Sequence, residues 1–327
     1  MKNLVGGRSK TPIMSKAVVF LNMGAPRNLD EVEVFLKNMF NDKNIITVKS
    51  DLLRKFISFL ITTTRKEEAK SNYKKLGGLS PLVKHTKEFN TLAKEIFSEY
   101  EVATIMRYTP PFADEVLSEL KKKDVEEIFL IPLYPQYSTT TTKSSLEDVE
   151  ESLKRLNYTP KIHTIKNFYK EEFYLRAIVD EIKKSLQGFD SKKFELVFSA
   201  HSLPQKIVDR GDSYQKEVEE QVNLLKDMLK DMQFKNIHLA YQSKLGPVKW
   251  LEPSLEDKLK SLEGKSVLIY PISFILDNSE TEFELSIEYK EVAEELKLSN
   301  YVVCPCINNN KNFITNLVNY SFSSTLP

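Results

Sequence analysis

Eight short apolar runs alternate with helical or polar stretches along the chain, and this alternation constrains the fold more than any other feature. Most runs are rich in Val, Ile, Leu and aromatic residues without strict alternation, which is typical of strands buried on both faces. Strands separated by amphipathic helices favour mainly parallel sheets with right-handed crossover connections. The runs are Ala17–Gly24, Val102–Thr109, Glu127–Pro135, Lys161–Phe168, Glu195–Ser202, Asn236–Ser243, Ser266–Ser273 and Tyr301–Asn308.

Four of these runs fall in each half of the 327-residue chain, which is long enough for two domains. We therefore predict an α/β fold of two similar doubly wound domains, each with a parallel four-stranded sheet, and an active-site cleft between them. The predicted segments are an N-terminal extension at 1–13, a first domain at 14–170, a second domain at 171–309, and a C-terminal helix at 310–327 that packs back on the first domain.

Composition excludes several classes of function. The 47 basic and 46 acidic residues nearly cancel, so no basic field indicates nucleic acid as a partner. No strand is followed by a glycine-rich phosphate loop, and the first residues lack the apolar core of a signal peptide. Two cysteines, Cys304 and Cys306, cannot supply the four thiolates of an iron–sulfur cluster. We expect a cytoplasmic protein with no such cluster.

Residues 51–64 form the most apolar segment outside the predicted strands, and basic residues follow at Arg65 and Lys66. Length alone does not separate a buried helix from a segment that lies at a membrane interface. The first interpretation is a buried helix. The second is an apolar lip that makes peripheral contact with a membrane, which would suit a substrate drawn from lipid.

His201 is the first candidate for chemistry, because it follows an apolar strand in the stretch Phe198–Pro204. Ligands of open α/β sheets bind at the carboxyl ends of strands, and an imidazole titrates near neutral pH. The other histidines, His85, His163 and His238, lie in a polar helical stretch or inside strands.

A second candidate follows the seventh run, where Asp277, Asn278 and Ser279 are all residue types that begin helices. Ser279 and Glu282 have the spacing of a capping box. The helix would place Glu280, Glu284 and Glu288 on one face. A solvated acidic face is one interpretation. The other is a row of carboxylates that leads to His201 and carries protons or guides a divalent cation.

Tyrosine, arginine and hydroxyl groups follow other strands, in Arg107–Pro111, Leu133–Thr142 and Tyr241–Pro247. Flat apolar faces suit an aromatic ligand, and cationic or hydroxyl groups bind carboxylates. Together these groups indicate a cleft for a planar molecule that bears carboxylates, beside a metal.

Five motifs in order then resemble the ferrochelatase family, whose members insert ferrous iron into a porphyrin to make haem. The motifs are Gly77-Gly-Leu-Ser-Pro81, Leu133-Tyr-Pro-Gln-Tyr-Ser138, Ser199-Ala-His-Ser-Leu-Pro204, Tyr241-Gln-Ser-Lys-Leu-Gly-Pro247 and the helix from Glu280. The resemblance covers nearly the whole chain and implies a two-domain chelatase fold of bacterial type, an enzyme of the lyase class, with porphyrin and Fe²⁺ as its small-molecule partners.

The resemblance also implies site residues. His201 and Glu280 match the family's catalytic and metal-binding pair, and Glu284 and Glu288 continue the proton or metal path. The residues that match porphyrin-binding positions are Met23, Arg65, Ser80, Arg107, Tyr108, Tyr137 and Ser138. One departure is Asn278, where many relatives carry a second histidine.

The chemistry that this resemblance implies is porphyrin distortion and removal of two pyrrolic protons, followed by entry of Fe²⁺ into protoporphyrin IX to form protohaem. His201 would accept protons, deliver the metal, or do both. The alternatives are another tetrapyrrole metal chelatase, acting on coproporphyrin or with cobalt, and a tetrapyrrole carrier without catalysis. No cofactor beyond substrate Fe²⁺ is expected.

Overall fold

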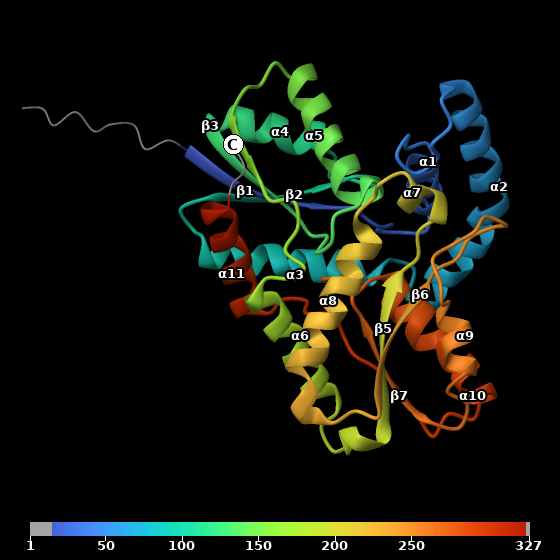
Figure 1. Ribbon diagram of the computed structural model, residues 1–327. Coiled ribbons are helices and arrows are strands. Elements are labelled where there is room, and N and C mark those ends of the chain that lie inside the picture. Colours follow the sequence, from blue (N-terminus) through green and yellow to red (C-terminus); the bar gives the residue numbers. More distant parts are fainter. Residues whose placement is uncertain (1–14, 325–327) are drawn as a thin grey trace, which may run out of the picture.

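The computed structural model describes residues 15–324, and Figure 1 shows a chain built from two groups of strands with helices around each. The predicted extension at 1–13 and the last three residues, 325–327, lie outside the described residues. Each group of strands is a parallel four-stranded sheet. The predicted α/β fold with two such sheets is confirmed.

The first sheet has the strand order β2-β1-β3-β4, and the second has the order β6-β5-β7-β8, so the two halves repeat one topology. In each half the first strand in sequence lies inside the sheet, paired on both sides with parallel neighbours. The strands are β1 (Ser15–Asn22), β2 (Glu101–Met106), β3 (Val125–Pro132), β4 (Lys161–Thr164), β5 (Phe194–His201), β6 (Asn236–Gln242), β7 (Ser266–Pro271) and β8 (Asn300–Val303).

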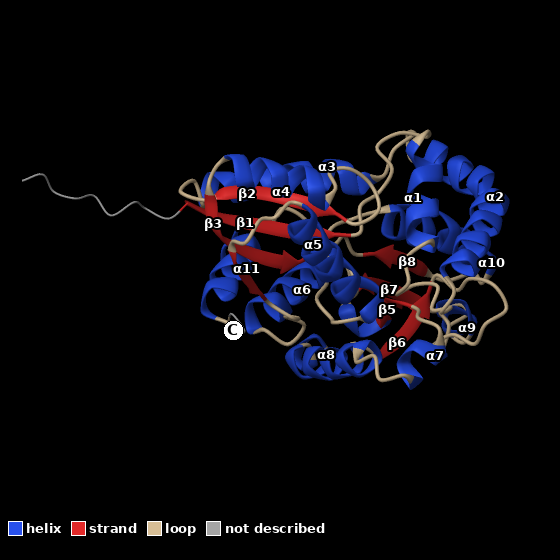
Figure 2. Ribbon diagram, turned by 90° about the horizontal axis from the view of Figure 1, so that it is seen from above, coloured by secondary structure: helices blue, strands red, loops and turns tan. Residues whose placement is uncertain are grey.

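Helices pack on both faces of each sheet, as Figure 2 shows from above. Before the second sheet the helices are α1 (Glu31–Phe40), α2 (Asp51–Lys75), α3 (Pro81–Ile96), α4 (Ala113–Lys122), the π-helical turn η1 (Thr139–Lys143), α5 (Ser144–Arg155), α6 (Glu172–Ser185) and the short turn η2 (Ser191–Lys193). After β5 they are α7 (Gln205–Asp209), α8 (Tyr214–Met228), the short turn η3 (Lys230–Met232), α9 (Leu255–Lys260), the π-helix η4 (Glu280–Glu288), α10 (Tyr289–Glu295) and α11 (Lys311–Ser323).

Several strands end earlier than the apolar runs predict. Strand β2 ends at Met106, and the backbone N–H of Arg107 then donates to the carbonyl of Asn22. Strand β8 ends at Val303, close to Pro305, which has no N–H to donate to a ladder. Cys304 and Cys306 therefore lie in the loop after β8, rather than in the predicted strand, and both are buried free thiols.

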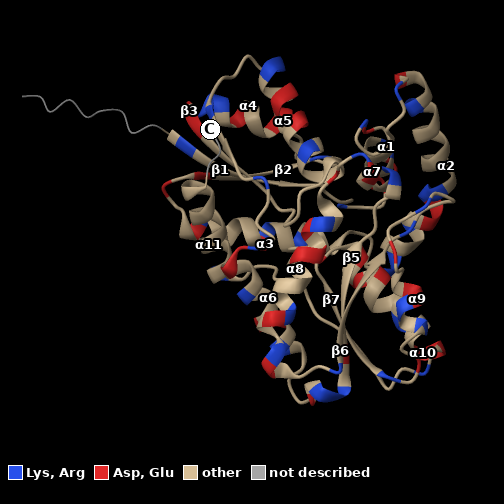
Figure 3. Ribbon diagram, viewed as in Figure 1, with Lys and Arg blue, Asp and Glu red and all other residues tan. Residues whose placement is uncertain are grey.

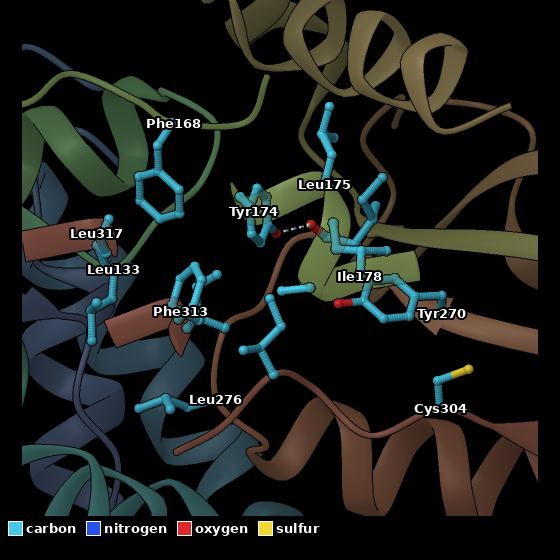
Figure 4. Close-up of a cluster of buried hydrophobic side chains, with 14 of the residues drawn as sticks. Leu133, Phe168, Tyr174, Leu175, Ile178, Tyr270, Leu276, Cys304, Phe313 and Leu317 are labelled. Carbon is cyan, nitrogen blue, oxygen red and sulfur yellow. Dashed lines mark hydrogen bonds between the residues drawn. The ribbon is translucent and has the colours of Figure 1, made fainter. Parts of the chain in front are cut away.

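One hydrophobic core joins the two halves, and Figure 4 shows part of it. Phe168 from the end of the first half packs on Tyr174 of α6 and on Phe313 of α11, at ring distances of 5.3 and 6.3 Å. At its far end α11 places Phe322 against Phe129 of β3, at 4.7 Å. The last helix therefore contributes side chains to the core beneath the first sheet.

Helix α2 leaves an apolar face uncovered along its first half. The interpretation of residues 51–64 as a buried helix is wrong, because only Ser58 and Thr62 in that range are buried. Leu52, Phe56 and Phe59 are 80%, 58% and 64% exposed. Among residues 15–324, no helix has the length and apolar character needed to cross a membrane.

Charged residues of both signs are interspersed along the ribbon in Figure 3. This pattern agrees with the near-zero net charge of the sequence.

Candidate functional site

His201 is the last residue of β5, and its backbone is fixed on two sides. Its N–H donates to the Ser273 hydroxyl at 3.1 Å, and its carbonyl accepts from the Tyr214 hydroxyl at 2.9 Å. The Tyr214 and Ser273 hydroxyls also lie 2.6 Å apart. Loop and helix side chains therefore hold the imidazole at the carboxyl end of the central strand, where the sequence places it.

The imidazole of His201 contacts the carboxylate of Glu280. Nδ1 of His201 lies 2.7 Å from Oε2 of Glu280, and these side chains are 37% and 31% exposed. The ring of Phe274 lies nearly perpendicular to the imidazole, with the ring centres 6.5 Å apart. Among the described residues, Nε2 of His201 has no hydrogen-bond partner, so it can take a proton or a metal from outside the pair.

Glu284 is joined to the same site through Ser243. The Ser243 hydroxyl lies 3.1 Å from Oε2 of Glu280 and 2.5 Å from Oε2 of Glu284, and the Ser243 N–H donates to Oε1 of Glu284 at 2.8 Å. The side-chain amide of Gln242 also donates a hydrogen bond to Oε2 of Glu284 at 3.2 Å. The backbone of Ser243 has φ of 65°, a left-handed conformation, and both its N–H and its hydroxyl reach the carboxylate of Glu284.

Helix η4 differs from the predicted α-helix because it is a π-helix over Glu280–Glu288. π-Helical segments are rare in proteins, and those that occur often lie at functional sites. Spacings of four residues still share a face in it, which brings Glu280 and Glu284 together, whereas Glu288 lies farther along and is exposed.

The predicted capping box at Ser279 is wrong. Ser279 has helical backbone angles and makes no side-chain cap. The side chain of Asn278 accepts the N–H of Glu280 at 2.8 Å instead. Asn278 therefore orders the start of η4.

The charges of the site shift one another's pKa values. Burial disfavours the charge on His201, but the carboxylate of Glu280 outweighs this and raises the pKa of the imidazole. Burial likewise opposes ionisation of Glu280, and the His201 charge outweighs it and lowers the pKa of that carboxyl. Burial and then the negative charge of Glu280 raise the pKa of Glu284 to about 7. The site therefore holds a proton-exchanging group near neutral pH.

Arg107 and Tyr108, after β2, belong to a separate polar cluster in the first half. The Tyr108 hydroxyl donates to Oδ2 of the buried Asp42 at 2.7 Å, and a guanidinium nitrogen of Arg107 lies 3.4 Å from the same oxygen. Arg107 also donates to Ser144 at 2.9 Å and lies 3.5 Å from Asp148. Tyr108 is fully buried. Its predicted contact with a porphyrin stays a prediction.

The other predicted porphyrin residues fall into two groups. Ser80 and Ser138 are buried, and their hydroxyls accept the N–H groups that begin α3 and η1. Met23, Arg65 and Tyr137 are partly exposed. Tyr137 lies under the ammonium of Lys166, at 4.6 Å from the ring centre. The roles of all five in binding stay predictions.

Sequence reasoning missed the residues that hold the pair in place, namely Gln242, Ser243, Tyr214 and Ser273. Gln242 ends β6 and Ser243 follows it, so their place at a strand end was a usable signal. Tyr214 begins α8 and carries no signal in the sequence. Two surface depressions, one on α8 and one beside α3, include neither His201 nor Glu280. The cleft between the halves stays a prediction.

Solved structures of chelatases share this fold. The chain aligns with "SirB from Bacillus subtilis with Fe3+" at a TM-score of 0.60 and 14% identity, over 94% of this chain and 96% of that one. It aligns with CbiX, described as the terminal enzyme for biosynthesis of sirohaem in denitrifying bacteria, at a TM-score of 0.52 and 10% identity, over 96% and 100% of the two chains. At such identities the likeness shows the fold alone.

Curated relatives are similar over nearly their whole length. A protein named Ferrochelatase from Nitratiruptor sp. is 54% identical over 303 residues, which cover 93% of this chain and 98% of that protein. Another of the same name from Sulfurimonas denitrificans is 51% identical over 306 residues, or 93% and 97% of the two chains. The family model Ferrochelatase matches residues 15–324. By this match and these identities, the chain belongs to the ferrochelatase family.

Proposed function

We propose that the chain is a lyase that inserts Fe²⁺ into protoporphyrin IX to form protohaem in haem biosynthesis. The observation that carries this proposal is the contact of 2.7 Å between His201 and Glu280, at a strand end in a chain that matches the ferrochelatase family from residue 15 to residue 324. A base and a carboxylate side by side suit a reaction that removes protons and admits a cation.

The proton steps use Nε2 of His201 as acceptor. Insertion releases two pyrrolic protons for each Fe²⁺ that binds the four ring nitrogens, so a proton acceptor must face the macrocycle. The raised pKa of His201 strengthens its hold on a proton once it is accepted. Glu284, with a pKa of about 7, then passes protons toward solvent, because it accepts and releases them near neutral pH.

The same residues provide the path of the metal substrate. Imidazole and carboxylate groups are ligands that Fe²⁺ accepts, and His201 with Glu280 supplies both. Glu284 and the exposed Glu288 continue the row away from the pair along η4. We propose that Fe²⁺ moves along this row to His201, and that no further cofactor and no iron–sulfur cluster take part.

The porphyrin is proposed to lie between the two halves, with Met23, Arg65, Ser80, Arg107, Tyr108, Tyr137 and Ser138 around it. Arg65 and Arg107 are the cations of that set and suit propionate groups. Binding energy along the ring would bend the macrocycle and expose the lone pairs of its nitrogens.

We further propose that the protein is cytoplasmic and contacts a membrane peripherally through residues 51–64. The uncovered side chains of Leu52, Phe56 and Phe59 support this, since clustered exposed apolar groups mark interaction surfaces.

The test is a metal-insertion assay with protoporphyrin IX and coproporphyrin, each with Fe²⁺, Co²⁺ and Zn²⁺. The expected result is fastest turnover of protoporphyrin IX with Fe²⁺, and a loss of about 10² to 10⁴ in kcat in His201→Ala. Porphyrin binding, followed by fluorescence quenching, should persist in that variant. His238→Ala is the matched control, since that histidine is also paired with a carboxylate, Glu195. Insertion at the wild-type rate by His201→Ala would overturn the proposal.

A further inference from the structure

A second group of potential metal ligands lies beside the site but on other residues. His85 of α3, Asp277 and Glu282 each place one nitrogen or oxygen within 4.8 Å of the others. His85 belongs to a helix of the first half, whereas Asp277 and Glu282 stand just before and within η4. The group therefore bridges the two halves of the molecule.

The spacing within this group suits two ligands of one ion better than a hydrogen bond. Nε2 of His85 lies 3.6 Å from Oε1 of Glu282, and N–H···O bonds run from about 2.7 to 3.2 Å. Two ligands at bonds of about 2.1 Å from a tetrahedral ion lie roughly 3.4 Å apart. The other ring nitrogen, Nδ1, is buried and has no hydrogen-bond partner among the described residues.

Asp277 is a buried carboxylate held by neutral donors alone. Its oxygens accept from the Thr281 hydroxyl at 2.9 Å, the Asn308 amide at 2.7 Å and the Cys306 N–H at 3.1 Å. Among residues 15–324, no Lys or Arg forms an ion pair with it. A buried anion without a cation is costly, and hydrogen bonds of this kind also orient metal-ligating carboxylates.

We propose that His85, Asp277 and Glu282 bind a divalent transition-metal ion of the Zn²⁺ type that ties α3 to the start of η4. One imidazole and two carboxylates suit such an ion, with water completing its coordination. Asp277 precedes Glu280 by three residues, so the ion fixes the beginning of the helix that carries Glu280 and Glu284. This ion is not the substrate metal, whose proposed ligands face Ser243 instead.

The test measures Zn²⁺ binding to the full chain by isothermal titration calorimetry, in a His201→Ala background that removes the other imidazole. One Zn²⁺ per chain is expected in this background. Adding His85→Ala should weaken that binding at least 100-fold, and adding Glu282→Gln at least 10-fold. Adding His238→Ala, which removes an imidazole with a single carboxylate neighbour, should leave it unchanged.

A second measurement, the melting temperature, distinguishes loss of metal binding from loss of folding. Zn²⁺ should raise the Tm of the His201→Ala chain, and the rise should vanish with Glu282→Gln, whose side chain is 46% exposed and tolerates substitution. Binding that persists unchanged in both His85→Ala and Glu282→Gln, or no binding in the His201→Ala chain, would overturn the proposal. Either result leaves the insertion assay, and thus the proposed function, untouched.

Discussion

After β3 the π-helical turn η1 presents four threonines in a row, whereas after β7 the π-helix η4 presents Glu280, Glu284 and Glu288. The two halves repeat one strand order, and each has a π-helical segment after its third strand, β3 or β7. The residues in these two segments are nevertheless chemically different. The repeated topology supplies the positions at the strand ends. The residue types at those positions then decide what each half can do.

The charged groups of the two halves are also balanced differently. In the first half the carboxylate of Asp42 is buried and accepts from Tyr108 and Ser144 beside the guanidinium of Arg107. In the second half His201 and Glu280 are each about a third exposed, and Nε2 of His201 points free of the pair. The carboxylate of Asp42 is thus enclosed by its partners, whereas the pair of His201 and Glu280 is partly exposed to solvent. The following substitutions test this difference between the two halves.

The largest effect on stability is expected from Asp42→Asn, which removes a buried charge from the first cluster. We expect the free energy of unfolding to fall by about 3 kcal/mol, because Arg107 loses its buried partner. Urea denaturation measures this, and the pH dependence of metal insertion should not change. Asp114→Asn is the control, since its ion pair with Arg155 is half exposed and such pairs contribute about 1 kcal/mol or less. Equal losses in both variants would contradict the distinction.

Glu280→Gln should have the opposite effects, with a loss of catalysis and little loss of stability. We expect kcat for metal insertion to fall about 10²-fold, because the amide no longer holds His201 as a proton acceptor, with little change in stability. Steady-state kinetics measure kcat and KM for the porphyrin separately. Glu291→Gln, which alters an exposed carboxylate of α10, serves as control. A loss confined to stability would place Glu280 with the structural residues.

Glu284→Gln should change how stability depends on pH. A carboxyl whose folded pKa is raised from 4.5 to about 7 stabilises the fold below pH 4.5, and this contribution is lost as the pH rises through 7. Relative to Glu284→Gln, the wild-type chain should therefore lose on the order of 1 kcal/mol between pH 5 and pH 8. Urea denaturation at these two pH values checks the sign. A wild-type chain that gains stability with rising pH, relative to the variant, would refute the raised pKa.

The smallest effect on stability is expected on α2. Replacing Leu52 and Phe59 by serine should change the free energy of unfolding by less than about 0.5 kcal/mol per site, because both side chains are exposed. Binding to anionic phospholipid vesicles should fall about 10-fold, as measured by co-sedimentation. Serine at Val248, an exposed apolar residue outside α2, is the control. Unchanged vesicle binding would remove the basis for membrane contact.

Much of the fold could be predicted from sequence, because buried parallel strands leave continuous apolar runs. Strand ends were less predictable, because they depend on pairing between strands that are far apart in sequence, and β2 pairs with β1 only as far as Met106. His201 stood out as a titratable residue at a strand end, and Glu280 as the first carboxylate of the helix that follows the seventh run. Tyr214 and Ser243 did not, because their importance lies in contacts with residues 13 and 41 positions away.

The exposure of α2 and the π-helical form of η4 were beyond the sequence for another reason. An apolar segment of this length has the same pattern whether it is covered or left open. Likewise the spacing of Glu280, Glu284 and Glu288 fits an α-helix and a π-helix alike. The local sequence pattern predicts which residues share a face of a helix, and tertiary packing decides what that face contacts.

The position of α11 has a consequence for synthesis of the chain. Phe322, in the last turn of α11, packs against Phe129 of β3 and stacks on Tyr100 at 5.1 Å. Part of the packing of the first half therefore depends on a side chain of α11. This part of the core is therefore complete only after α11 has been synthesised, although domains at the amino terminus generally fold first. Maturation of the two halves is thus coupled, and loss of Phe322 would disturb the packing around Tyr100 and Phe129 in the first half.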